Sequence, residues 1–131
     1  MRRALEESVT WIASELVAAG YRADVSLGSL EELDRYIDDN TDNGEPKSGV
    51  LLRQKGRCVL ALGAYVGEAI RRAQGGQWFL DPDRPNDIFY IQLRLDDGLC
   101  MWPMQRVWKR ITNGPEDCLA HYGEVAVSMA S

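Results

Sequence analysis

Ten consecutive residues, positions 58 to 67 (CVLALGAYVG), place apolar or small side chains on every side of a helix. A helix that is apolar all round has to be surrounded by other elements, so we expect this segment at the centre of the fold. The helical pattern extends over residues 49–72, and Gly75 and Gly76 end it. Gly63 and Gly67 lie one turn apart, and each costs up to about 1 kcal/mol relative to Ala. We therefore expect both to admit the backbone or a large ring of a neighbouring element.

Two amphipathic helices are predicted before this central segment. Their apolar stripes are Leu5, Val9, Ile12 and Leu16 in the first and Leu30, Leu33, Tyr36 and Ile37 in the second. Gly20 suits the end of the first helix. Ser29 and Glu32 have the spacing of a capping box at the start of the second. Residues 38–46 are polar and rich in turn formers, which predicts a loop.

Three short strands are predicted after the central helix, over residues 77–80, 88–95 and 99–102. The middle strand alternates, with Phe89, Ile91, Leu93 and Leu95 on one face and Tyr90, Gln92 and Arg94 on the other. Two further helices begin near Pro103 and Pro115. The sequence thus predicts an α+β fold: N-terminal helices and a long central helix pack on a small three-stranded antiparallel sheet, followed by two C-terminal helices. The length of 131 residues fits one domain spanning residues 1–131.

The charge balance limits the classes of partner. Fifteen Lys and Arg face twenty Asp and Glu, a formal charge of -5. Binding to nucleic acid or to an anionic membrane needs cationic surface, so we expect neither. An acidic chain is compatible with a basic protein partner. Because Glu6 and Glu7 interrupt the N-terminal segment where a signal peptide would be apolar, we expect a cytoplasmic protein.

No motif in the sequence predicts catalysis, a metal site or a cofactor. Cys58, Cys100 and Cys118 are widely spaced and form no Cys-x-x-Cys pair. The loop from Asp39 resembles a calcium loop, but its twelfth position is Val50, where a bidentate Glu is required. Cys118 and the single histidine, His121, have no third group to orient them. We therefore expect a non-enzymatic binding protein.

An acidic stripe is the candidate binding site. Glu31, Asp34 and Asp38 recur at i, i+3 and i+7, on the face that we expect to lie opposite Leu30, Leu33 and Ile37, and Asp39 and Asp42 continue the negative charge into the loop. One interpretation is a solvated surface. The other is a docking face for a basic partner, with Tyr36 or Tyr90 as an exposed aromatic anchor.

Glu68 supports an alternative function. It follows Gly67 directly and is expected near the sheet, where burial perturbs carboxyl pKa values. One hypothesis is a small-molecule-binding protein or enzyme with a pocket lined by Tyr65, Glu68 and Arg72. The structural interpretation is an ion pair between Glu68 and Arg72 at i, i+4. A third hypothesis is an accessory domain that oligomerises through its sheet edge.

Several segments resemble a family of small uncharacterised bacterial proteins, a domain of unknown function. They are residues 29–37 (SLEELDRYI), 62–72 (LGAYVGEAIRR), 76–78 (GQW) and 103–114 (PMQRVWKRITNG). The resemblance spans about residues 27–122 and implies an intracellular α+β domain with no established reaction. Small acidic bacterial proteins of this type include immunity proteins that neutralise toxins. From this association of type, and not from particular residues, our leading hypothesis is an immunity protein that neutralises a toxin domain by binding it through the acidic stripe.

Overall fold

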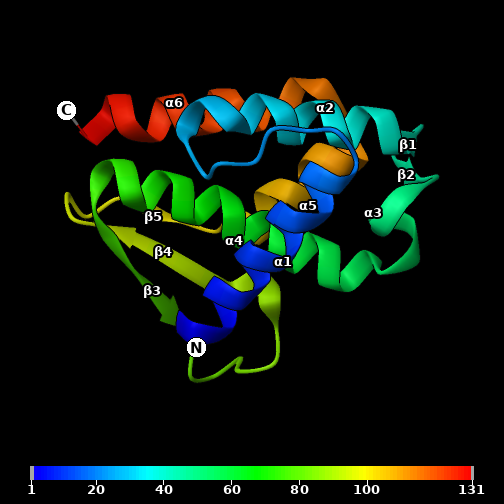
Figure 1. Cartoon of the computed structure of the whole chain (residues 1–131). Helices are drawn as coiled ribbons and strands as arrows, with labels where there is room; N and C mark the ends of the chain where they lie inside the picture. The colour runs from blue at the N-terminus through cyan, green and yellow to red at the C-terminus, as the bar shows by residue number, and fades with distance from the viewer. Residues whose placement is uncertain (1, 131) are drawn as a thin grey trace.

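The apolar segment at positions 58 to 67 lies in the central helix of the molecule, α4 (Lys55–Gln74). The structure is a computed structural model that describes residues 2–130. From Cys58 to Ile70, every residue of α4 except Leu60 is buried. Three helices pack around it: α1 (Arg2–Ala18), α5 (Pro103–Asn113) and α6 (Leu119–Ala130) (Figure 1). The predicted central position of this segment is confirmed.

The predicted helix over residues 49–72 is divided into two. A short helix, α3 (Gly49–Arg53), ends at Gln54, and α4 begins at the next residue. Gln54 has φ −138° and ψ 60°, which lie outside the helical region and turn the chain between the two helices. The C-terminal end of α4 is at Gly75, whose φ of 81° favours glycine.

Gly63 and Gly67 lie at two close contacts of α4. A Cβ atom on Gly63 would stand 2.6 Å from Cγ and 2.8 Å from Cα of Met104 in α5. A Cβ atom on Gly67 would overlap the indole ring of Trp78. The expectation that these glycines admit a neighbouring backbone and a large ring is therefore confirmed.

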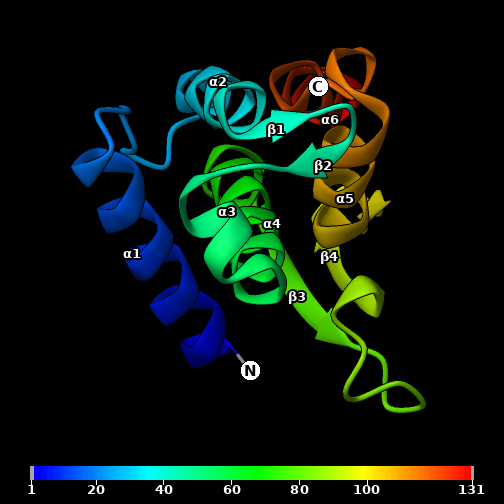
Figure 2. The same ribbon diagram turned by 90° about the vertical axis from the view of Figure 1, so that its right-hand side faces the viewer.

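A three-stranded antiparallel sheet covers one side of α4 and α5 (Figure 2). Its strands are β3 (Gly76–Leu80), β4 (Ile91–Leu95) and β5 (Cys100–Met101), in the order β3-β4-β5. Ile91, Leu93 and Leu95 are buried on its inner face. The predicted middle strand is shorter than expected, because residues 88–90 form a 3₁₀ turn, η2 (Ile88–Tyr90).

The second helix begins with a 3₁₀ turn, η1 (Leu27–Ser29), and continues as α2 (Leu30–Asn40). The prediction of a capping box formed by Ser29 and Glu32 is wrong. Ser29 has helical dihedral angles, whereas an N-cap residue is extended. Ser26 caps the turn instead, by accepting from the Ser29 N–H at 3.2 Å. Glu32 accepts from the backbone N–H of Arg22.

The predicted polar loop over residues 38–46 is also more ordered than expected. α2 continues through Asn40, and β1 (Thr41–Asp42) and β2 (Glu45–Pro46) form a small antiparallel hairpin. Its turn is Asn43-Gly44, with φ of 56° and 81°. Asn-Gly is the residue pair that favours such a tight turn, because both positions require positive φ.

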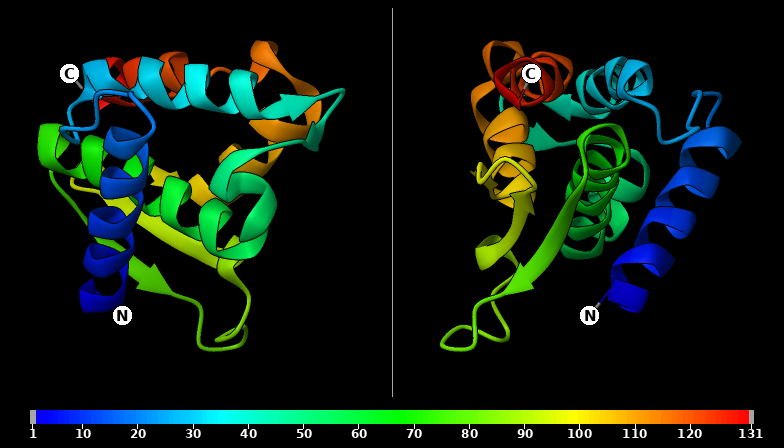
Figure 3. Two further views of the ribbon diagram at one scale, coloured as in Figure 1. Left: turned by 45° about the vertical axis from the view of Figure 1, so that its right-hand side comes forward. Right: turned by 90° about the vertical axis from the view of Figure 1, so that its left-hand side faces the viewer.

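The C-terminal part contains α5, the 3₁₀ turn η3 (Pro115–Asp117) and α6, which lies beside α2 (Figure 3). In residues 2–130 the chain thus forms six α-helices, a three-stranded sheet and a two-stranded hairpin. The predicted α+β class, with C-terminal helices, is confirmed. None of the helices in this range is long and apolar enough to cross a membrane.

Candidate functional site

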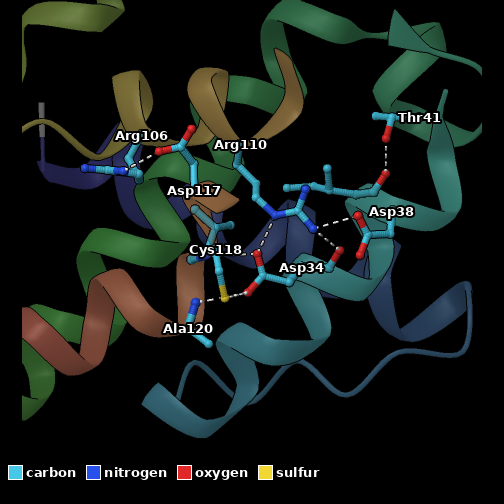
Figure 4. Close-up of polar contacts among 10 residues, drawn as sticks. Asp34, Asp38, Thr41, Arg106, Arg110, Asp117, Cys118 and Ala120 are labelled. Carbon is cyan, nitrogen blue, oxygen red and sulfur yellow. Dashed lines mark hydrogen bonds and ion pairs between the residues drawn. The ribbon is translucent and has the colours of Figure 1, made fainter. Parts of the chain in front are cut away.

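Asp34 lies at the centre of a polar cluster that joins three helices (Figure 4). Arg110 of α5 is 2% exposed and donates to Oδ1 of Asp34 at 2.8 Å and to Oδ1 of Asp38 at 2.7 Å. Burial alone would lower the pKa of Arg110, but the hydrogen bonds to Asp38 and Asp34 outweigh it and raise that pKa. The cluster therefore holds a charged guanidinium between two carboxylates.

Asp34 also caps the N-terminus of α6. Its two carboxylate oxygens accept from the backbone N–H groups of Leu119 at 2.9 Å and Ala120 at 3.0 Å. The thiol of Cys118 donates to the same carboxylate at 3.1 Å. Burial and this hydrogen bond raise the pKa of Cys118, so the thiol stays protonated at neutral pH and is a poor nucleophile. The arrangement serves packing of α2, α5 and α6.

The expectation that Asp34 belongs to an exposed docking stripe is wrong, because only 9% of it is exposed. Positions 30 and 34 are one turn apart, so Asp34 lies on the same side of α2 as the buried Leu30. Tyr36 is also buried, and its hydroxyl accepts from the backbone N–H of Leu51 at 3.2 Å. Tyr36 is therefore a core residue and not an exposed anchor.

The other four predicted contact residues do lie at the surface. They form what we call the acidic surface: Glu31, Asp38, Asp39 and Asp42. Asp38 pairs with Arg110, and Asp39 accepts from the hydroxyl of Tyr21. Burial and the bond to Asp39 raise the pKa of Tyr21 to about 12. The acidic surface thus lies on α2 and β1, and two of its members have partners within the chain.

The pocket predicted around Glu68 is closed. Glu68 is 2% exposed and accepts from Arg71 at 2.7 Å and from Nε1 of Trp78 at 2.9 Å. Burial would raise the pKa of Glu68, but the hydrogen bonds from Arg71 and Trp78 outweigh it and lower that pKa. Arg72 lies 3.4 Å from the same carboxylate.

Tyr65, the third predicted member of the pocket, is fully buried. Its hydroxyl shares a hydrogen bond with Ser29 and accepts from the Val25 N–H at 2.9 Å. Tyr65 therefore anchors the start of α2, and Glu68 anchors β3 through Trp78. The structural interpretation of Glu68 fits this geometry, and the predicted pocket does not form.

A different surface has the features of a binding site. We call it the aromatic face, and it surrounds a hollow of about 460 Å³ on the outer side of the sheet. Phe79 and Trp102 are 36% and 39% exposed there. The lining residues are Phe79, Asp81, Tyr90, Gln92, Arg94, Trp102 and Gln105.

Cation–π contacts hold parts of this face in place. The Arg94 guanidinium lies 3.7 Å from the centre of the Phe79 ring, and that of Arg84 lies 4.0 Å from the Tyr90 ring. The amide of Gln105 donates to the Phe89 carbonyl at 2.6 Å. The alternation of β4 predicted that Tyr90, Gln92 and Arg94 share a face, but Phe79 and Trp102 were not identified as its members.

Compared with models of known protein families, with curated proteins and with solved structures, the chain shows no significant match. The resemblance to a family of small bacterial proteins therefore stays a prediction. Within the described chain, no group of three His, Cys, Asp or Glu side chains is placed to hold a metal ion.

Proposed function

We propose that this protein is a non-catalytic binding protein that recognises another protein through the aromatic face. The observation that carries the proposal is the pair of exposed rings, Phe79 and Trp102, beside a hollow lined by Tyr90 and Arg94. Trp, Tyr and Arg are the residues most enriched among those that dominate binding energy at protein interfaces. A partner side chain that fills the hollow would bury these rings.

The support of the face by β-strands favours tight binding. Phe79 lies in β3 opposite Gln92 of β4, and Arg94 covers the Phe79 ring. Side chains that are already held in place lose little conformational freedom when a partner binds, which reduces the entropy cost of association. The same residues on a mobile loop would bind less strongly.

The internal polar groups also favour binding over catalysis. The carboxylates of Asp34 and Glu68 and the thiol of Cys118 each have hydrogen-bond partners within the chain. A general base or nucleophile needs access to a substrate, and Asp34 and Glu68 are almost fully covered. Their positions support a role in packing the helices and the sheet.

A second proposal, which depends on a different surface, is that the protein is an immunity protein that neutralises a toxin with a basic surface. Its contact residues would be the acidic surface of Glu31, Asp38, Asp39 and Asp42, because opposite charges speed encounter and fix orientation. These residues lie on α2 and β1, at the other end of the molecule from β3 (Figure 1). Changing Glu31→Lys and Asp42→Lys would slow association with such a toxin, and an unchanged association rate would contradict this proposal.

Differential affinity capture tests the aromatic face. The bait proteins are the wild type, the double variant Phe79→Ala/Trp102→Ala and a matched control, Val17→Ala/Leu52→Ala. The control removes two apolar side chains that are more exposed, at 59% and 53%, on other elements. We expect one protein from the native cells to be retained stoichiometrically by the wild type and the control and lost with the aromatic variant. Equal retention by all three baits would overturn the proposal.

A further inference from the structure

The charges around the aromatic face identify the chemistry of its partner. We infer that this face receives an extended, acidic segment of the partner protein, with an apolar side chain in the hollow and carboxylates beside Arg94 and Lys109. The inference rests on the proposed function and adds to it the sign of the partner's charge and its conformation.

Cations that have no ion-pair partner within residues 2–130 lie at this face, although the chain as a whole carries -5. Among the described residues, Arg84, Arg94 and Lys109 form no ion pair with a carboxylate. Asp81 is the acid that lines the hollow, and its Oδ1 already accepts from the Asp83 N–H at 2.9 Å. A partner carboxylate at the first hollow would thus meet the Arg94 guanidinium, which forms no ion pair with a carboxylate of the described chain.

The shape of the surface favours an extended chain. A second hollow of about 220 Å³ adjoins the first and shares Trp102 and Gln105 with it. It is lined further by Cys100, Met101, Arg106, Lys109 and Tyr122. Two hollows in succession, separated by an exposed ring, accept successive side chains of an extended peptide.

Lys109 and Arg106 have different roles in the second hollow. Arg106 pairs with Asp117 at 3.0 Å and lies over the Tyr122 ring, so its charge is already balanced. Lys109 is exposed and has no such partner among the described residues. The cations available to a ligand are therefore Arg94 at the first hollow and Lys109 at the second.

Aromatic rings and cations are also used to bind single-stranded nucleic acid, but the charge balance favours a peptide. Nucleic acid carries a continuous row of phosphates and depends on many cationic contacts. The aromatic face offers two such cations, Arg94 and Lys109, and the net charge of -5 would repel a long polyanion. A peptide with a few carboxylates meets the same cations with less repulsion, because it carries fewer negative charges.

Selection from random linear peptides displayed on phage tests the inference with the full chain as bait. We expect the enriched peptides to carry net negative charge and at least one large apolar residue. Arg94→Glu/Lys109→Glu should weaken their binding on the order of tenfold or more, since it places like charges together. The matched control, Lys47→Glu/Arg53→Glu, makes the same change in net charge at two exposed positions, one directly after β2 and one in α3. It should bind the peptides as the wild type does.

Three other results of these experiments would overturn the inference of an acidic peptide. Neutral or basic peptides that bind the aromatic face, and are lost with Phe79→Ala/Trp102→Ala, would overturn the inference and leave the proposed function intact. No enrichment, or equal binding by the two charge-reversal variants, would also overturn it, while affinity capture separately decides whether the face binds a protein. If a fluorescent oligothymidylate bound more tightly than the enriched peptides, the ligand of this face would be a nucleic acid and the inference of a peptide would be wrong. Unchanged urea unfolding of each variant confirms that folding is retained.

Discussion

The carboxylate of Asp34 accepts hydrogen bonds from the Arg110 guanidinium and from the first backbone N–H groups of α6. A buried ion pair adds stability only when its remaining donors and acceptors have partners, and this cluster meets that condition. Loss of Asp34 would leave Arg110 with Asp38 as its carboxylate partner. It would also leave the first backbone N–H groups of α6 without the acceptor that Asp34 provides. A single residue thus connects α2, α5 and α6.

Substitution of Asp34 tests this role. We predict that Asp34→Ala lowers the free energy of unfolding by about 3–5 kcal/mol, the range expected when one partner of a buried pair is removed. Glu31→Ala, at an exposed position of the same helix, should have a much smaller effect. Urea unfolding of both variants measures the difference. Equal stability of the two variants would show that the cluster is not a structural support.

Glu68 predicts a dependence of stability on pH. Its folded pKa lies below the ordinary value of 4.5, so its contribution is present above that value and is lost as the pH falls through the folded pKa. The difference in unfolding free energy between wild type and Glu68→Gln should therefore be large near neutral pH and shrink below 4.5. Urea unfolding across this range measures it. A difference that stays constant with pH would contradict the lowered pKa.

At the scale of elements, the contact between α4 and β3 positions the sheet. The Trp78 ring lies against Gly67, and its Nε1 donates to Glu68 on the next position of α4. This contact fixes β3, and through the register Trp78↔Leu93 it fixes β4. The outer side of both strands then presents Phe79 and Arg94 together.

Two glycines of α4 make a matched pair for testing this contact. Gly67→Ala would drive a methyl group into the Trp78 ring, and overpacking costs about 1–3 kcal/mol. Gly56→Ala has no atom within 4 Å of its new Cβ, so it should gain up to about 1 kcal/mol of helix propensity. Thermal or urea unfolding should therefore shift in opposite directions for the two variants. A Gly67→Ala protein as stable as the wild type would contradict the close contact.

The helices and the sheet could be predicted because their signals are local. Apolar periodicity located α1, α2, α4 and α5, and the alternation around Leu93 located β4. The break at Gln54 had no local signal, because the residues around it are compatible with a continuous helix. The Asn43-Gly44 turn did carry a signal, but its flanking strands are two residues long and polar, so the pattern indicated a loop.

The buried cluster and the aromatic face were harder to predict because both depend on residues that are distant in the sequence. Asp34 meets Arg110, which is 76 positions away, and no local pattern connects them. Arg110 lies between the apolar Val107 and Ile111 in the sequence, which could have indicated that it is buried. A buried cation needs a carboxylate partner. The aromatic face likewise required the register of β3 on β4, which places Phe79 next to Gln92.

For the whole molecule, the acidic surface and the aromatic face lie at different ends. The acidic surface occupies α2 and β1, and the aromatic face occupies the outer side of the sheet. Figure 2 shows α2 and β1 apart from β3 and β4. The buried cluster around Asp34 and the packing of α4 lie between them. The interior therefore holds the two surfaces in fixed positions, and the binding that we propose would take place at the exterior.

Site-specific photo-crosslinking measures most directly whether the aromatic face binds a protein. A benzophenone amino acid replaces Trp102 in one variant and Val17, on α1, in another. We predict that irradiation in the native cells joins position 102 to one defined protein and that position 17 gives no such product. A crosslink of the same protein to both positions, or to position 17 alone, would contradict the assignment of binding to this face.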